Sequence, residues 1–358
     1  MTIKRLILAV AGILALGGCG HTDEPATGGA GDGNVMFGAY VSTPTGTRAS
    51  VADMRMLKKT GFGVFASQSG NDDFNPDASA GFTPGFMCNQ KVGWSPSVSD
   101  GAWIYEPVKS WTGSKLSFFA YAPYSEGGGE TGITGMSGPQ DAGSPRLSFR
   151  MDSDIDSQTD LLYADASSTV NLVNSGQVQF VFLHALSRIG FSCAADGSIA
   201  SGTNVTVRKI VFKSSELGVA GDLDLFAGRW VNLEKREMAY TLSAAESDFI
   251  KGNNEISSAK ATTVSPLTAN GKYLMLIPSG DKVAVEISID YDVTTADDRL
   301  EGGNLTVSNN RVTRFDYVFE MGKAYDFTLR IGMDAVVVGV GVTDWDSTES
   351  DWKPVEKK

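Results

Sequence analysis

The sequence predicts an all-β protein built from two β-sandwich domains. From Phe62 onward, apolar and polar residues mostly alternate with a period of two, which indicates half-buried strands. Clusters of Gly, Pro, Asn, Asp and Ser separate these segments, and such residues form the turns between strands. Many short strands joined by turns are typical of sandwiches. The 358 residues are enough for two domains of ordinary size.

Residues 1–18 are predicted to be a signal peptide and are excluded from the fold. Lys4 and Arg5 precede a short apolar run that is too brief to span a bilayer comfortably. The run ends in LGGC, which resembles the lipobox of bacterial lipoproteins. This resemblance implies that Cys19 is lipidated and becomes the mature N-terminus. An ordinary signal peptide followed by an unrelated cysteine is the alternative.

Residues 19–34 are predicted to form a flexible tether, because they are rich in glycine and acidic residues and have no apolar periodicity. The pair Asp23-Glu24 resembles the surface-export signal of Bacteroidetes lipoproteins. Together these features predict a protein that is anchored by lipid at the outer membrane and exposed on the cell surface.

The domain boundary is predicted at residue 176, inside the turn-like stretch VNLVNSGQ. The N-terminal domain is then 35–176, with a first strand in 35–48, and the C-terminal domain is 177–358. One short amphipathic helix is predicted over Val51 to Lys59. Strands are predicted at 61–67, 103–111, 115–124, 178–194, 204–214, 272–280, 282–293, 311–320, 324–332 and 334–345.

Charge and composition exclude several classes of function. The net charge is −12 and the pI is near 4.7, which argues against nucleic acid as a partner. Of the two histidines, His21 lies in the tether, and His184 lies in a strand pattern where a buried, hydrogen-bonded histidine is expected. No nucleophile-elbow sequence occurs. The sequence therefore predicts no enzyme and no cofactor.

The best candidate for a metal site is MDSDIDSQTD, where Asp152, Asp154 and Asp156 alternate as in the start of an EF-hand loop. Ser157 stands where the sharp-turn glycine belongs, and Tyr163 stands where the bidentate glutamate belongs. We therefore predict an ordinary polar loop and no metal site.

Trp94, Trp103 and Trp111 raise the possibility of sugar binding, since exposed tryptophans can stack on sugar rings. Large aromatic residues also fill the cores of sandwiches, and this is the favoured interpretation. A glycan-binding lipoprotein that stays anchored through Cys19 remains the alternative function. Cys88 and Cys193 are predicted to be two separate, mostly buried thiols.

A loop containing Arg48 follows the first strand, and a cut between Arg48 and Ala49 would release residues 19–48. Removing a strand from a sandwich exposes unpaired backbone groups and a strip of core, which an incoming strand can cover.

The segment 333–345 could supply that strand, because Val336, Val338, Val340 and Val342 would share one face. If this segment were exposed to solvent, its high valine content would promote aggregation. Pairing within its own domain is the alternative.

The exported chain resembles the fimbrillin-like proteins of Bacteroidales, the subunits of the type V pilus. The resemblance rests on motifs that occur in order along the chain. They are the lipobox at Cys19, Thr47-Arg48, GFGVFA at 61–66, FFAYAPY at 118–124, TDLLYA at 159–164, FLHALSRIGF at 182–191, LMLIP at 274–278 and YDFTLRIG at 325–332.

The resemblance implies two tandem antiparallel β-sandwich domains of the transthyretin type and export as a lipoprotein. It also implies cleavage by an arginine-specific protease, with Arg48 and Ala49 at the matching position. Polymerisation with other pilus subunits by donor-strand exchange would follow, for adhesion and colonisation through host or bacterial surface receptors. The family includes stalk, tip and anchor subunits, and the sequence leaves this choice open.

Overall fold

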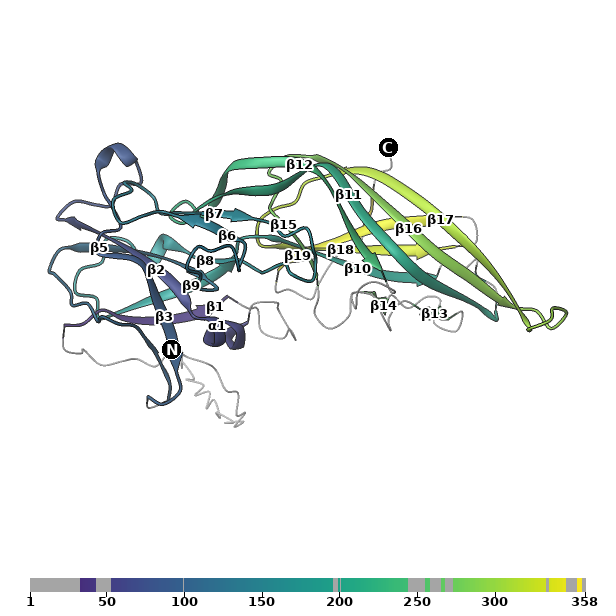
Figure 1. Ribbon diagram of the computed structural model, residues 1–358, viewed down its shortest axis with the longest axis horizontal. Coiled ribbons are helices and arrows are strands. Elements are labelled where there is room, and N and C mark those ends of the chain that lie inside the picture. The colour runs from purple at the N-terminus through teal and green to yellow at the C-terminus, as the bar shows by residue number, and fades with distance from the viewer. Residues whose placement is uncertain are drawn as a thin grey trace, which may run out of the picture.

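The computed structural model of the protein describes residues 33–42, 53–98, 100–195, 199, 201–243, 255–257, 265–267, 273–332, 335–345 and 353–355. Over these residues the chain is almost entirely β, which confirms the predicted fold class. The described part forms an elongated body, with the N-terminal strands at one end and the long C-terminal strands at the other (Figure 1). None of its helices is long and apolar enough to cross a bilayer.

The helical elements are α1 (Met54–Thr60) and the short 3₁₀ turns η1 (Ala78–Ala80) and η2 (Ala166–Ser168). The strands of the first half are β1 (Met36–Val41), β2 (Phe62–Gly70), β3 (Met87–Ser95), β4 (Ala102–Ile104), β5 (Lys115–Ala122), β6 (Ile133–Met136), β7 (Arg146–Arg150), β8 (Leu162–Ala164) and β9 (Gln177–His184). Those of the second half are β10 (Ser187–Ala195), β11 (Thr203–Asp224), β12 (Arg229–Ser243), β13 (Glu255–Ser257), β14 (Ser265–Pro266), β15 (Leu274–Leu276), β16 (Val283–Ala296), β17 (Asn304–Tyr317), β18 (Lys323–Ile331), β19 (Val336–Asp344) and β20 (Lys353–Pro354).

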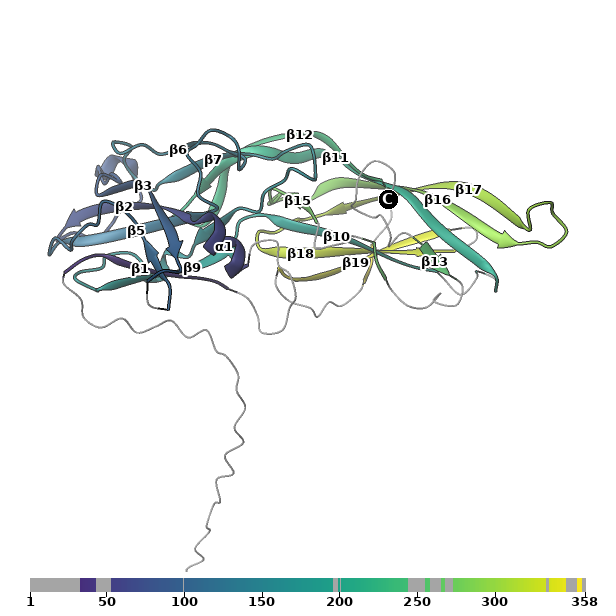
Figure 2. The ribbon, with the colours of Figure 1, turned by 60° about the horizontal axis from the view of Figure 1, so that its bottom comes forward.

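The N-terminal sheet has the order β1-β9-β8-β5-β2-β3-β4. β1 runs parallel to β9, and the other neighbours are antiparallel. Figure 2 shows β1 and β9 side by side at the margin of this sheet, next to α1. The helix begins where the Asp53 carboxylate accepts a hydrogen bond from the Met56 N–H, and it ends at Gly61. It confirms the predicted helix with a small shift, and Val51 lies outside the described residues.

The C-terminal half is a sandwich of two sheets. One has the order β14-β10-β18-β19-β20, and the other contains β17, β16 and β11, with β12 also paired to β11. Apolar side chains from both sheets form one continuous core, including Phe191, Phe212, Phe315 and Phe327. The two inner faces are therefore packed against each other, as expected for a sandwich.

The long strand β11 connects the two halves of the molecule. It has 22 residues, and its first part pairs with β16 while its last five residues pair with β7 of the N-terminal half. A second apolar core lies at this junction and combines Phe119 and Leu147 with Leu223 and Ile277. The halves therefore share both a sheet and a core.

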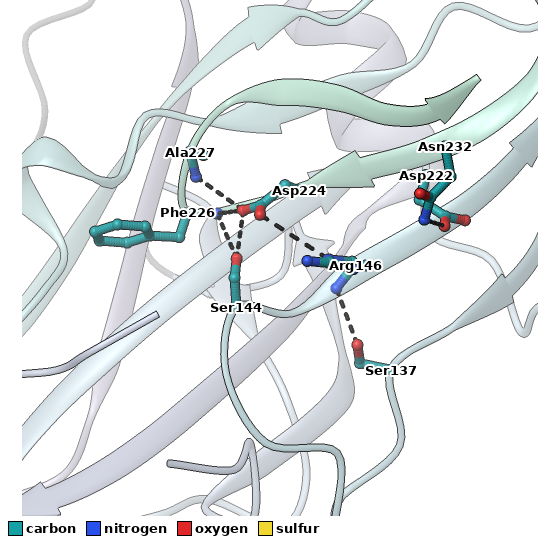
Figure 3. A network of polar contacts seen from close by, with 8 residues as sticks. All are labelled: Ser137, Ser144, Arg146, Asp222, Asp224, Phe226, Ala227 and Asn232. Carbon is teal, nitrogen blue, oxygen red and sulfur yellow. Dashed lines mark hydrogen bonds and ion pairs between the residues drawn. The ribbon is translucent and has the colours of Figure 1, made fainter. Parts of the chain in front are cut away.

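A polar network reinforces the junction (Figure 3). The Asp224 carboxylate accepts hydrogen bonds from the Phe226 and Ala227 N–H groups, at 3.1 and 2.9 Å, and from the Ser144 hydroxyl. The Arg146 guanidinium lies 4.0 Å from the same carboxylate. These contacts satisfy the buried carboxylate and bind the turn after β11 to the segment that leads into β7.

The change from the first sheet to the next differs from the predicted boundary at 176. The predicted strand 178–194 is two strands, because β9 lies in the N-terminal sheet and β10 in the C-terminal one. The chain crosses between them at Ala185 and Leu186, which are fully buried. The turn residues before Gln177 instead end a loop within the first half, where Leu172 pairs with Leu116.

We predict that the two halves unfold in one transition and that Leu223→Ala lowers the free energy of unfolding by about 2–5 kcal/mol. Leu223 is fully buried in the shared core, so the change leaves a cavity there. Urea unfolding followed by tryptophan fluorescence and far-UV circular dichroism measures both quantities.

Leu305→Ala is the matched control, because half of the Leu305 side chain is exposed and the expected loss is below about 0.5 kcal/mol. Two separate transitions in the unaltered protein would contradict a shared core.

Candidate functional site

The first strand, β1, closes the N-terminal core. It pairs with β9 from Met36↔Gln177 to Val41↔Phe182. Val35, Phe37 and Val41 point inward and are only 0%, 2% and 3% exposed. Met36 and Tyr40 alternate with them and are exposed, as the period of a strand requires.

The start of β1 is also held on its other side, by residues 105–111. The Val35 N–H donates to the Lys109 carbonyl at 2.8 Å, and the Trp111 N–H donates to the Gly33 carbonyl at 2.8 Å. The buried Tyr105 hydroxyl donates to the Val35 carbonyl, also at 2.8 Å. β1 therefore fills a slot between β9 and residues 105–111. The sequence predicts a continuous strand over 103–111, whereas β4 ends at Ile104 and residues 105–111 follow it.

Phe37 is the central side chain of the slot. Its ring lies 5.0 Å from that of Tyr105 and 5.5 Å from that of Phe180, measured between centroids, and it also contacts Phe62 and Phe118. Burial of one such side chain contributes about 1.5–3 kcal/mol. Removal of β1 would take this contact away from all four rings.

A close approach between β1 and β9 occurs at Gly38, which pairs with Gln179. A Cβ at residue 38 would lie 2.5 Å from Cδ of Gln179 and closer still to both terminal atoms of the amide. The neighbouring Gln177 side chain donates to the Phe37 carbonyl at 3.1 Å. The outer side of the slot is therefore lined by two glutamines, one of which lies directly over a glycine.

The predicted processing residues Cys19, Arg48 and Ala49 lie outside the described residues. The chain is described up to Ser42 and again from Asp53. Lipidation at Cys19 and cleavage between Arg48 and Ala49 stay predictions.

The predicted donor segment pairs within its own half of the molecule. β19 pairs with β18 over all nine of its residues, and within the described ranges β20 pairs with its other edge at two positions. Val336, Val338 and Val340 are buried in the C-terminal core, whereas Val342 is 38% exposed. The alternative pairing that the sequence left open is therefore present, and donation to another subunit stays a prediction.

The end of β19 is attached to the junction of the two halves. Trp345 is buried, and its backbone N–H donates to the Gly322 carbonyl at 2.9 Å. Its indole ring stacks on the His184 ring, with 4.4 Å between the centroids. Nδ1 of His184 lies 2.8 Å from a carboxylate oxygen of the buried Asp160. His184 is therefore the buried, hydrogen-bonded histidine that the sequence predicts. A cavity of about 280 Å³ lies beside it, bordered by Ser42, Tyr163 and Trp345.

The three tryptophans considered for sugar binding do not form an exposed platform. Trp103 is 6% exposed and lies in the N-terminal core. Trp94 packs against it edge-on at 5.2 Å, with the Lys58 ammonium 4.2 Å from the Trp94 ring. Trp111 packs on Phe118 and donates its indole N–H to the Gly176 carbonyl. The rings on β3, β4 and the following segment thus pack toward the same core, Trp103 as a buried residue and Trp94 and Trp111 as partly buried ones.

The aspartate loop is a polar turn, as predicted. The Asp152 carboxylate accepts from the Asp154 N–H, and the Asp154 carboxylate accepts from the Asp156 N–H and the Ser157 hydroxyl. These are local turn contacts. Within the described ranges, no group of three or more metal-ligating side chains could hold an ion.

Both described cysteines are free thiols, in agreement with the prediction. Cys193 is fully buried, and burial raises its pKa to about 12. Cys88 is partly exposed, and partial burial together with the Asp141 carboxylate raises its pKa above the usual value.

We predict that iodoacetamide labels Cys88 in the native protein and labels Cys193 only after unfolding, as read by peptide mass spectrometry. Because the thiolate is the reactive form and the pKa of Cys88 is raised, labelling of Cys88 should be slow at pH 7 and accelerate toward pH 9. Native labelling of Cys193 at a similar rate would contradict its burial.

We also predict that Tyr105→Phe lowers the free energy of unfolding by about 1–3 kcal/mol, because the buried Val35 carbonyl loses its donor. Amide hydrogen exchange at β1 should accelerate, since the same hydroxyl holds this strand. Tyr40→Phe is the control, because the Tyr40 side chain is exposed. Equal effects of the two substitutions would show that the Tyr105 hydroxyl does not hold β1.

Comparisons with known proteins agree with this fold. A fimbrial protein from Bacteroides vulgatus ATCC 8482 has a similar crystal structure, with a TM-score of 0.72 and 22% identity over 87% of this chain and 99% of that chain. Putative cell adhesion proteins from Bacteroides uniformis ATCC 8492 and Bacteroides ovatus ATCC 8483 are similar at TM-scores of 0.48, with 16% and 15% identity. Each comparison covers 88% of this chain, and 100% and 99% of the respective relative. No curated protein matches the chain.

Residues 47–345 match the family model described as fimbrillin-like. Because this match spans most of the chain, the protein belongs to the fimbrillin-like family.

Proposed function

We propose that the protein is a pilus subunit that assembles by exchange of its first strand for a strand of another subunit. It is exported as a lipoprotein, reaches the outer surface of the outer membrane through Cys19, and is cut between Arg48 and Ala49 by an arginine-specific protease. Loss of β1 opens the slot, and a strand from another subunit fills it. The fibre then serves adhesion and colonisation.

The observation that carries this proposal is the position of β1 in the chain and in the core. β1 is the first described element, so a single cut behind it separates the strand covalently from the rest of the protein. β1 and the preceding Val35 nevertheless supply three buried side chains, and β1 adds a six-residue ladder to the sheet. One cut separates β1 from the rest of the chain, and the slot that it leaves has an apolar core to cover. β1 is therefore suited to replacement by another strand.

The vacated slot offers recognition on both sides. The β9 edge presents the backbone groups that now pair with β1, and residues 105–111 present the Lys109 carbonyl, the Trp111 N–H and the Tyr105 hydroxyl. Backbone hydrogen bonds would bind any extended chain, and the apolar pockets select its side chains. An open slot of this kind is also an aggregation hazard until a strand enters.

The donor is proposed to be the segment around β19. Its release breaks a nine-residue ladder with β18 and withdraws three valines from the C-terminal core. Insertion into the slot of another subunit provides a new ladder and a new apolar environment in exchange. Such an exchange is slow where both ladders are long, so a freshly cut subunit should polymerise after a delay.

Mass spectrometry of the mature N-terminus from cell-surface fractions tests the proposal. The expected result is a chain that begins at Ala49 in the fibre fraction. A chain that begins at lipidated Cys19 in all fractions would overturn cleavage and favour an anchored role.

We predict that Arg48→Ala abolishes polymer formation after treatment with an arginine-specific protease, because β1 stays attached. Polymers are measured by gel electrophoresis of unheated samples and by size-exclusion chromatography. Arg55→Ala is the matched control, since Arg55 is an exposed arginine at the start of α1. This variant should assemble normally. Efficient assembly of Arg48→Ala would place the cut elsewhere, and loss of assembly in Arg55→Ala would place it at Arg55.

A further inference from the structure

We infer that the donor segment of a second copy of this chain enters the β1 slot in one register, with Val336–Val342 in place of Val35–Val41. Gly339 then occupies the position of Gly38, against Gln179. This inference rests on the proposed strand exchange and adds the residues that fix how two subunits fit together.

The buried positions of the slot set the first condition. Inward-facing residues of β1 are 35, 37, 39 and 41, and the first, second and fourth of these are almost fully buried. A replacing strand must place apolar side chains at all four positions, because a carboxylate there would be buried without a partner. A shift of one residue would move every side chain to the opposite face.

The donor sequence meets this condition in one register. Val336, Val338, Val340 and Val342 fit the four inward positions together. A shift of two residues in one direction places Asp334 inward, and a shift of two in the other places Asp344 inward. A shift of one residue places Gly339 and Gly341 inward and leaves the pockets of the slot unfilled. The two aspartates thus bracket a single favourable alignment.

A second, independent feature limits the register to two alignments, with Gly339 or Gly341 at position 38, and the second of these places Asp344 inward. The Gln179 amide lies over Gly38, so a side chain at this position would force the glutamine to move. In the register selected by the valines, residue 38 is replaced by Gly339. Because Gly339 is at the centre of Val336–Val342 and Gly38 is at the centre of Val35–Val41, this holds for a donor parallel or antiparallel to β9.

The volumes of the side chains also fit this exchange. Valines replace valines at positions 35 and 41. Two further valines enter the pockets of Phe37 and Ala39. A valine is smaller than Phe37 and larger than Ala39, so the side-chain volume lost at position 37 is regained in part at position 39. Val337 and Gly341 fall at the outward positions 36 and 40, where Met36 and Tyr40 are exposed and side-chain size is not restricted.

Disulfide trapping between two full-length variants tests the register. Subunits with Gly339→Cys are mixed with subunits with Gln179→Cys, treated with an arginine-specific protease, oxidised and boiled in SDS without reductant. Neighbouring strands hold paired Cα atoms within the range that a disulfide spans. The expected result is a covalent dimer that dissociates on reduction. Mixing Gly341→Cys with Gln179→Cys should give none, and this pair controls for Cys88 and Cys193.

The register would be overturned, with strand exchange intact, if polymers form but Gly339→Cys gives no disulfide with Gln179→Cys. The same holds if Gly341→Cys gives an equal amount of disulfide with Gln179→Cys. If unaltered subunits form no polymer after cleavage, strand exchange itself fails, and the register fails with it.

Steric rescue provides a second measurement. Gly339→Ala should slow polymerisation about tenfold, because the added methyl group meets Gln179 in the slot. Gln179→Ala in the same chain should restore the rate, and Gly341→Ala should assemble at the unaltered rate. Circular dichroism and the urea midpoint verify that each variant folds before cleavage. Equal defects in Gly339→Ala and Gly341→Ala, or no rescue by Gln179→Ala, would overturn the inference.

Discussion

The packing of Phe37 among four aromatic rings is the interaction on which the N-terminal half depends. Phe62, Phe118 and Phe180 come from three other strands, and Tyr105 comes from the segment that holds β1 on its second side. Each of these rings is buried and packs against Phe37 of β1. The sheet is complete only when some strand occupies this place, and nothing in the geometry requires that strand to belong to the same chain. In the proposed assembly, closure of the core and exchange of a strand would therefore depend on the same slot.

The arrangement separates two requirements that would otherwise conflict. In the proposed assembly the precursor would have to be stable during export, and the slot, with its aromatic pocket and its hydrogen bonds on two sides, would provide that stability. The subunit would later have to lose the same strand, and the position of β1 at the start of the described fold would make the cutting of one peptide bond sufficient. The C-terminal sandwich and the shared core of Phe119, Leu147 and Leu223 do not include β1, so they keep their packing when it leaves.

The sequence predicts the all-β fold and the single helix well, because alternation and amphipathic periodicity are local signals. It misses β12, because the central residues Lys235, Arg236 and Glu237 are exposed and only the end of the strand, with Tyr240 and Leu242 buried, alternates. It also misses β6, which lies inside a glycine-rich stretch and is recognisable only through its pairing with β7. The division of 178–194 between two sheets depends on tertiary packing at Ala185 and Leu186, and an apolar run gives no sign of it.

Prediction of the site was similarly uneven. The alternation in 35–41 and in 336–342 identifies two strands with buried faces, and both exist. The contribution of Tyr105, Lys109 and Gln179 to the slot could not be found from the sequence, because it arises from residues that are distant along the chain. The three tryptophans pack toward the core, in line with the general tendency of large aromatic residues to be buried.

The direct passage from β9 to β10 has a mechanical consequence. In a fibre joined by strand exchange, a pulling force would enter a subunit through the strand beside β9 and leave through the donor segment. β9 continues through Ala185 and Leu186 into β10, and β10 pairs with β18 in parallel over Arg188 to Ala195. Tension along these strands would load many hydrogen bonds together in shear, instead of opening them one after another like a zip. The load path would therefore bypass the surface loops, and a stretched fibre should resist extension through its sheets.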